Sequence, residues 1–155
     1  MIDAFVPKML CAPVRGLPSA EVLQQMVDYW KAELGLQAWD IQVVYCRERD
    51  LEARNKGCTA VCYAAYYVEK AEIKFVTDFD DSDCPCRNNH CYEEAVVHEL
   101  MHVRFDRALD VNWVQSHPGN EMLYENAIDQ TAKALVRQRR AFAHESFIIN
   151  GPTAH

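Results

Sequence analysis

The chain has 155 residues, of which half are hydrophobic and a quarter charged, the composition of an ordinary globular domain able to bury a core. Its formal charge of −7 repels phosphate backbones, so we expect no general nucleic-acid binding. No stretch approaches the ~20 apolar residues that span a bilayer, and the N-terminus lacks the pattern of a secretory signal, so no membrane association is expected.

The first part of the chain contains one predicted helix. Three prolines make residues 1–18 an extended lead-in to what we expect to be a single domain over residues 1–155. Ser19 suits an N-cap, and apolar side chains then recur at helical spacing. Gly35 suits the end of this helix, because glycine readily adopts positive φ.

A group of strands is predicted next. Residues 39–46, "WDIQVVYC", favour one strand, and residues 57–77 favour two antiparallel strands joined near residues 66–69. In the second of this pair, Ile73 and Phe75 alternate with mostly polar residues. That alternation is typical of an edge strand with one exposed face.

Two further helices are predicted after an acidic loop at residues 78–90. The first runs from about residue 92 to 108 and the second from about residue 120 to 140, with residues 141–155 as a tail. The arginines of "RQRR", residues 137–140, suit a solvated helix end. The expected fold class is therefore α+β, with a small antiparallel or mixed sheet packed on these helices.

Polar residues interrupt the apolar helix "CYEEAVVHELMHVRFDRA" at His98, Glu99 and His102. Successive helical residues rotate by about 100°, so the three side chains fall within about a quarter of a turn. Two imidazoles one turn apart can share a metal ion, and "HELMH" matches H-E-x-x-H. The alternative, two core histidines bonded to backbone carbonyls, is disfavoured by the pairing and by the adjacent glutamate.

A catalytic zinc ion takes three protein ligands and leaves one position for water. The metzincin pattern needs a histidine six residues after His102, where this chain has Ala108. The remaining candidates for a third ligand are Asp106, His117, Glu121 and Glu125. Glu125 is favoured because it begins a row of residues at helical spacing that we expect to face inward, with Ile128, Ala132 and Leu135. A carboxylate that faces inward needs a cation or hydrogen-bond donors. Glu121 and His117 remain alternatives.

Asp129 lies one helical turn beyond Glu125 on the same predicted stripe. We expect its carboxylate to accept the free ring N–H of a ligand histidine and so to fix the tautomer of that ring. If the helix is rotated by a third of a turn, both acids are exposed instead.

The pair "HELMH" and "ENAID" resembles the gluzincin zinc peptidases, whose downstream helix carries E-x-x-x-D. The chain is most similar to the single-domain minigluzincins, including metallopeptidases encoded by bacteriophages, with SprT-like proteins more distant. The likeness covers roughly residues 40–140. It implies a zincin-like minimal catalytic domain in which Zn²⁺ is bound by His98, His102 and Glu125. Tyr124 departs from the pattern, because the longer members carry asparagine there.

The resemblance implies hydrolysis of peptide bonds in a protein or peptide substrate. Glu99 would be the general base for a zinc-activated water, and Asp129 would support a ligand histidine. Candidate donors for the transition state are Tyr124 and His117, with Tyr66, Tyr67 and Arg107 equally eligible from the sequence. The expected edge strand at residues 72–76 could hold the substrate backbone, or it could be an ordinary edge strand on which Lys74 discourages aggregation. The alternative function is a non-catalytic, zinc-containing module that binds a protein.

The seven cysteines are an odd number without an export signal, which indicates reduced thiols and a cytoplasmic protein, in the host cytoplasm if phage-encoded. Cys84, Cys86, His90 and Cys91 lie within eight residues and could hold a second, structural zinc ion. Cys58 and Cys62 would share one face of a strand and could contribute. No C-x-x-C pair is present, so free thiols are the favoured interpretation.

Overall fold

A computed structural model describes residues 18–78, 91–109, 113 and 116–149, the last seven of these as backbone alone. Its main elements in chain order are α1 (Ala20–Glu33), β1 (Asp40–Cys46), β2 (Ala60–Ala65), β3 (Lys70–Val76), α2 (Tyr92–Phe105) and α4 (Asn120–Ile149). Three short 3-10 helices are η2 (Glu48–Asp50), η3 (Ala53–Asn55) and η5 (Asp106–Ala108). The described residues therefore form an α+β fold, as predicted.

The three strands form one mixed sheet in the order β1–β3–β2. β3 pairs with β1 in parallel and with β2 antiparallel. The prediction of an edge strand at residues 72–76 is therefore wrong, because β3 is the central strand. The alternation in β3 has another cause: Ile73 and Phe75 face the helices, while Glu72 and Lys74 lie half-buried on the open face.

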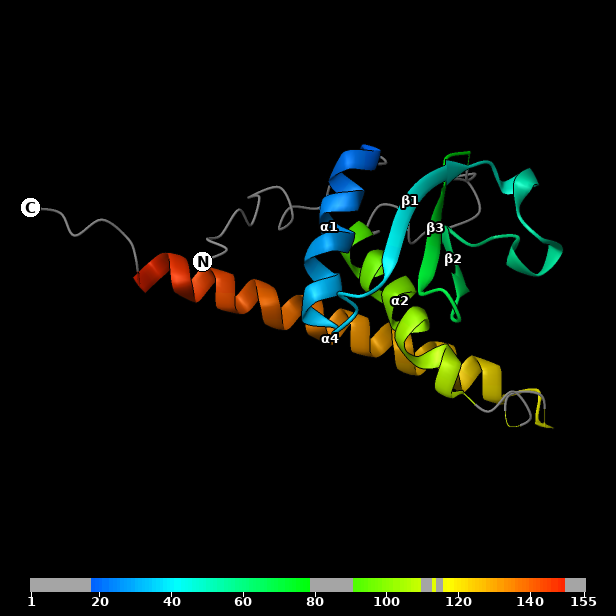
Figure 1. Cartoon of the computed structure of the whole chain (residues 1–155). Coiled ribbons are helices and arrows are strands. Elements are labelled where there is room, and N and C mark those ends of the chain that lie inside the picture. Colours follow the sequence, from blue (N-terminus) through cyan, green and yellow to red (C-terminus); the bar gives the residue numbers. More distant parts are fainter. Residues whose placement is uncertain (1–17, 79–90, 110–112, 114–115, 150–155) are drawn as a thin grey trace, which may run out of the picture.

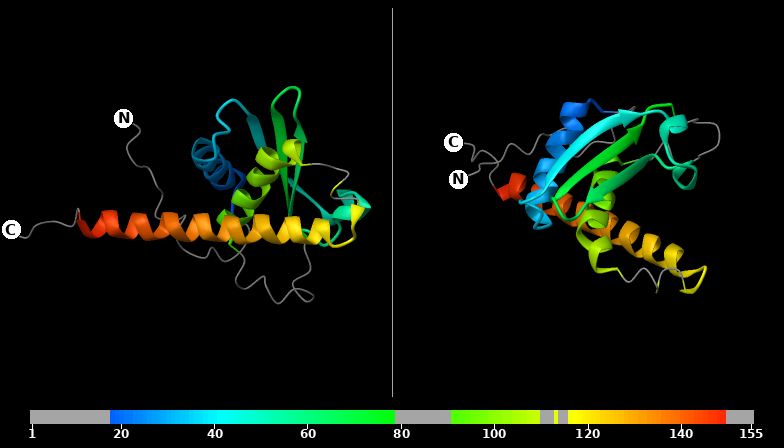
Figure 2. Two further views of the ribbon diagram at one scale, coloured as in Figure 1. Left: turned by 90° about the horizontal axis from the view of Figure 1, so that it is seen from below. Right: turned by 45° about the vertical axis from the view of Figure 1, so that its right-hand side comes forward.

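The molecule has three layers, which Figures 1 and 2 show from different sides. α1 and α2 cover one face of the sheet, where α1 contacts β1 and α2 contacts β2. α4 packs against α2 on the side away from the sheet. As a result α2 is buried nearly all round, with Val96, Val97 and Leu100 fully buried. Any polar side chain on α2 must therefore find a partner inside the protein.

The ends of α1 follow the prediction. The Ser19 side chain caps the first turn by accepting from the backbone N–H of Val22 at 3.4 Å. Gly35, at φ 69°, lies just beyond the helix in the left-handed region that favours glycine. Buried side chains of α1, including Leu23 and Trp30, join the main core.

α4 is longer than predicted. It continues from Asn120 through Ile149, so the expected tail begins later than residue 141. Its C-terminal part extends past the other elements in Figure 1. Residues 150–155 of the expected tail lie outside the described residues. Within the described part of the chain, no helix is long and apolar enough to cross a bilayer.

Two of the "RQRR" arginines are not solvated as predicted, because they surround a buried carboxylate of α2. Glu93, only 2% exposed, accepts from Trp30 Nε1 at 3.0 Å, while its two oxygens lie 2.7 Å from Arg139 Nη1 and 3.3 Å from Arg140 Nη2. The Arg139 guanidinium also lies 4.5 Å from the centre of the Tyr29 ring. We refer to Glu93, Trp30, Arg139 and Arg140 as the Glu93 cluster.

Candidate metal centre

α2 presents His98 and His102 on one side, one turn apart. Their rings meet edge-on with centroids 5.0 Å apart, and the two Nε2 atoms lie 3.2 Å from each other. The side chains are only 22% and 16% exposed. The helical spacing of four thus brings the two imidazoles together, as the sequence predicts.

α4 adds Glu125 to this pair. Its Oε2 atom lies 3.3 Å from His98 Nε2 and 3.4 Å from His102 Nε2. The helix is oriented by a buried stripe that includes Ile128 and Ala132, which begins just beyond the carboxylate. The predicted inward stripe is therefore confirmed, and it turns Glu125 toward α2.

The three donor atoms form a nearly equilateral triangle with edges of 3.2, 3.3 and 3.4 Å. Zinc bonds of about 2.0–2.1 Å in a tetrahedral site place neighbouring ligand atoms about 3.3–3.4 Å apart. The triangle therefore matches one face of such a tetrahedron, and two imidazoles with a carboxylate suit a zinc ion. We refer to these three atoms as the donor triangle. Among the described residues, no other group of three such side chains is close enough to hold a metal ion.

Glu99 lies buried beside the donor triangle, with 7% of its surface exposed. A backbone hydrogen bond from Cys62 on the edge strand β2 holds its carboxylate. Burial raises the pKa of Glu99, although the nearby His98 and His102 act in the opposite direction. A buried carboxyl with a raised pKa next to possible metal ligands has the properties of a general base.

The carboxylate beside a ring nitrogen of His102 is Asp106, and not Asp129, for which this place was predicted. Asp106 Oδ1 lies 3.1 Å from His102 Nδ1 and accepts from the Tyr124 hydroxyl at 2.5 Å. Asp129 instead pairs with Lys133, one turn along the same helix, at 2.6 Å. The missed signal was the spacing of four between His102 and Asp106, which continues the row that His98 begins.

The side chains of the centre shift one another's pKa values. Burial lowers the pKa of His102, but hydrogen bonds to Asp106 and Glu125 outweigh it and raise the pKa to about 10. Hydrogen bonds from His102 and His98 lower the pKa of Glu125 to about 2. A metal ion must therefore displace a proton from His102 at neutral pH.

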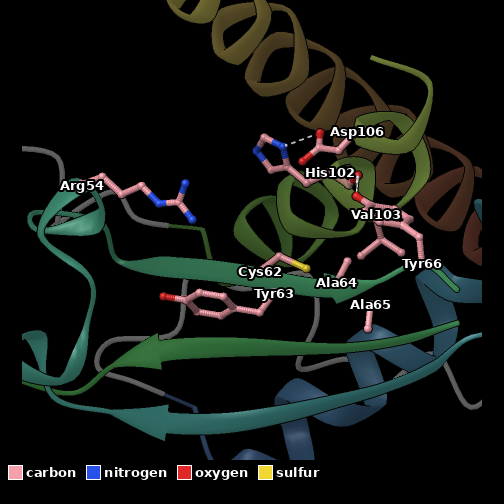
Figure 3. A pocket seen from close by; sticks show the side chains of 9 residues that line it. All are labelled: Arg54, Cys62, Tyr63, Ala64, Ala65, Tyr66, His102, Val103 and Asp106. Atoms are coloured by element: carbon pink, nitrogen blue, oxygen red, sulfur yellow. Dashed lines mark hydrogen bonds and ion pairs between the residues drawn. The ribbon is translucent and has the colours of Figure 1, made fainter. Parts of the chain in front are cut away.

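A pocket of about 410 Å³ opens beside His102, between β2 and the C-terminal end of α2 (Figure 3). Cys62, Tyr63 and Tyr66 line it from the side of β2, and Arg54 of η3 points into it. The Tyr66 hydroxyl donates to the His102 carbonyl at 3.3 Å. The pocket adjoins the side of the site that His102 and Asp106 border.

Several predicted residues are not part of this centre. His117 is exposed, and its Nδ1 accepts from the backbone N–H of Gly119 at 3.1 Å. Glu121, Tyr67 and Arg107 are also exposed. None of these four side chains belongs to the group that could hold a metal ion. Of the predicted transition-state donors, Tyr124 borders the site, because its ring meets that of His102 edge-on at 5.9 Å.

Most residues of the predicted cysteine site lie outside the part of the chain that the structure describes. Cys84, Cys86 and His90 lie outside the described residues. Cys91 is half-buried, and its sulfur lies 3.0 Å from Arg140 Nη2. Cys58 precedes β2, so it does not share a strand with Cys62 as predicted. The proposed second zinc ion stays a prediction.

Comparison with protein-family models, with curated proteins and with solved structures finds no match. The resemblance to gluzincins therefore stays a prediction from the two sequence motifs. The side chains of His98, His102 and Glu125, and the distances between them, indicate a possible metal site.

Proposed function

We propose that the protein is a zinc-dependent peptidase with a zincin-like fold. The donor triangle of His98, His102 and Glu125, with the buried Glu99 next to it, is the observation that carries this proposal. A zinc ion held there would supply an acidic bound water and polarise a substrate carbonyl. The zinc fit is supported by the near-equal edges of the triangle and by its two imidazoles.

Glu99 is the proton carrier in this proposal. It would accept a proton from the attacking water and pass it to the amine that leaves. Burial makes this carboxyl a stronger base than an exposed glutamate, and the hydrogen bond from the Cys62 backbone fixes its position. Both properties suit a group that must hold a proton and then release it.

The edge strand β2 is the proposed binding site for the substrate backbone. Among the described strands it pairs with β3 alone, so its outer edge is open to strand addition. The pocket beside His102 borders the same strand and would receive a substrate side chain. This assignment replaces the one predicted for residues 72–76, which lie in the central strand.

The test is peptide cleavage by the zinc-loaded protein, with a broad peptide library at neutral pH. We expect Glu99→Gln to reduce turnover by about 10²- to 10⁴-fold, the usual contribution of acid–base catalysis, at unchanged zinc content. Glu94→Gln, the same change on the same helix, is the matched control. Zinc-bound wild type that cleaves no peptide would favour the alternative, a zinc-containing module that binds proteins without catalysis.

A further inference from the structure

We propose that Asp106 and Tyr124 are the positioning residues of the metal centre. Together they fix the orientation of the His102 ring. They also hold the start of α4 against α2 in the position that brings Glu125 to the two histidines. This inference rests on the zinc site of the proposed function, but it does not depend on which reaction occurs there.

The two nitrogens of His102 face different partners. Nε2 points into the donor triangle, 3.2 Å from His98 Nε2, while Nδ1 lies 3.1 Å from Asp106 Oδ1. A nitrogen that binds a metal ion must offer a lone pair, so the ring proton must then sit on Nδ1. Asp106 accepts that proton in a hydrogen bond and thereby selects the tautomer that can bind metal.

Asp106 is itself held in place by Tyr124. The Tyr124 hydroxyl donates to the same Oδ1 atom that faces His102. Its ring also packs edge-on against the His102 ring, with an angle of 72° between the planes. His102 therefore contacts a linked pair of side chains, one from the end of α2 and one from α4.

Tyr124 also holds the first part of α4 in place, so that Glu125 stays opposite the two histidines of α2. The fully buried side chains of α4 begin at Ile128, and Met122 and Leu123 are at least 60% exposed. Among the described residues of α4 before Ile128, only Tyr124 and Glu125 bond to α2 or to Asp106 at its end. Because Tyr124 directly precedes Glu125, its bond to Asp106 fixes the carboxylate relative to the two histidines.

The experiment measures zinc affinity by competition with a chromophoric chelator at neutral pH. We expect Asp106→Asn to weaken zinc binding by about 10- to 100-fold, the usual effect of removing such a partner. Tyr124→Phe should cause a smaller loss, roughly tenfold or less, and the double variant should lose no more than Asp106→Asn alone. Asp40→Asn, an exposed carboxylate on β1, is the matched control.

A second measurement separates positioning from general loss of structure. In the zinc-loaded wild type, nitrogen NMR of the imidazoles should show one protonated nitrogen on His102, Nδ1, with slow proton exchange. Asp106→Asn should speed that exchange, and Asp106→Glu should partly restore it. Circular dichroism checks the fold, and Tyr124→Phe provides the test if Asp106→Asn does not fold.

The proposal is overturned if Asp106→Asn and Tyr124→Phe bind zinc as tightly as the wild type. It is equally overturned if Asp129→Asn causes the 10- to 100-fold loss in place of Asp106→Asn. A wild type that binds no zinc would remove both this inference and the proposed function. Normal zinc binding without peptide cleavage would remove the proposed function alone.

Discussion

Two groups of polar side chains join α2 to α4, one at each end of the contact between these helices. They differ in whether the protein itself supplies the positive charge that their carboxylate needs. In the Glu93 cluster the buried carboxylate accepts from Trp30 and pairs with Arg139 and Arg140, so its charge is met within the protein. In the donor triangle three atoms that can each offer a lone pair face one another.

The difference shows why only the second group suits a metal ion. Arginine is permanently protonated, so the Glu93 cluster needs no further cation. An imidazole nitrogen without its proton offers a lone pair, so a metal ion can take the place of the proton on His102. The same two helices thus carry one cluster whose buried carboxylate already has its positive partners and one group of donor atoms that an added cation would complete.

The largest predicted effect is on the free energy of unfolding and concerns the Glu93 cluster. Glu93→Ala leaves Arg139, whose side chain is 8% exposed, without its buried counter-charge. Breaking a buried ion pair in this way costs about 3–5 kcal/mol, so we expect a loss of that size in the free energy of unfolding. Urea denaturation measures it, with Glu94→Ala as the control on the same helix. A loss below about 1 kcal/mol would mean that the pair is solvated.

Zinc should stabilise the protein by binding to the donor triangle. At a free zinc concentration 100 times the dissociation constant, the free energy of unfolding should rise by about 2.7 kcal/mol. A chelator should reverse the gain, and Glu125→Gln should reduce it. Thermal unfolding with and without zinc provides the measurement. Because the two groups are separate, a folded Glu93→Ala protein should keep the gain, and its loss there would show that they are coupled.

Zinc affinity should rise with pH. The pKa of His102 is about 10 in the metal-free protein, so a proton must leave when zinc binds at neutral pH. Affinity should therefore increase about tenfold per pH unit between pH 7 and 9. Chelator competition at several pH values measures this slope, with calorimetry in buffers of different ionisation enthalpy as a check on proton release. A flat profile would show that His102 is neutral before metal binds.

The metal-free protein should show the opposite trend in stability. The raised pKa of His102 stabilises the fold below its ordinary value of 6.5, and this contribution is lost as the pH rises through about 10. The lowered pKa of Glu125 stabilises the fold above 4.5, and this contribution is lost as the pH falls toward about 2. The two groups together stabilise the fold most between pH 4.5 and pH 6.5, their ordinary pKa values. Urea denaturation at pH 6 and pH 9 with a chelator present should show the higher stability at pH 6.

The smallest predicted effect concerns Lys133, which holds Asp129 away from the role first expected for it. The two side chains are 36% and 40% exposed, so the pair is a surface ion pair. Lys133→Ala should change the free energy of unfolding by about 0.5 kcal/mol or less and leave zinc affinity unchanged. A clear change in zinc affinity would place Asp129 in the metal centre after all.

The sequence by itself determined the features that depend on local spacing. The helix fixes the angle between residues four apart, so His98 and His102 had to share one face. The same periodicity placed Glu125 at the start of the buried stripe of α4. The strands were predictable for a similar reason, because runs of β-branched and aromatic residues favour extended backbone.

Only the tertiary structure decided which elements meet, because register and packing between distant segments leave no local periodic signal. The parallel pairing with β1 made β3 a central strand, although its alternation suited an edge. The packing of α4 on α2 brought Tyr124 to Asp106 and the two arginines to Glu93. The spacing of four already placed Asp106 beside His102, but the second bond of Asp106, to Tyr124, depends on where α2 ends beside α4.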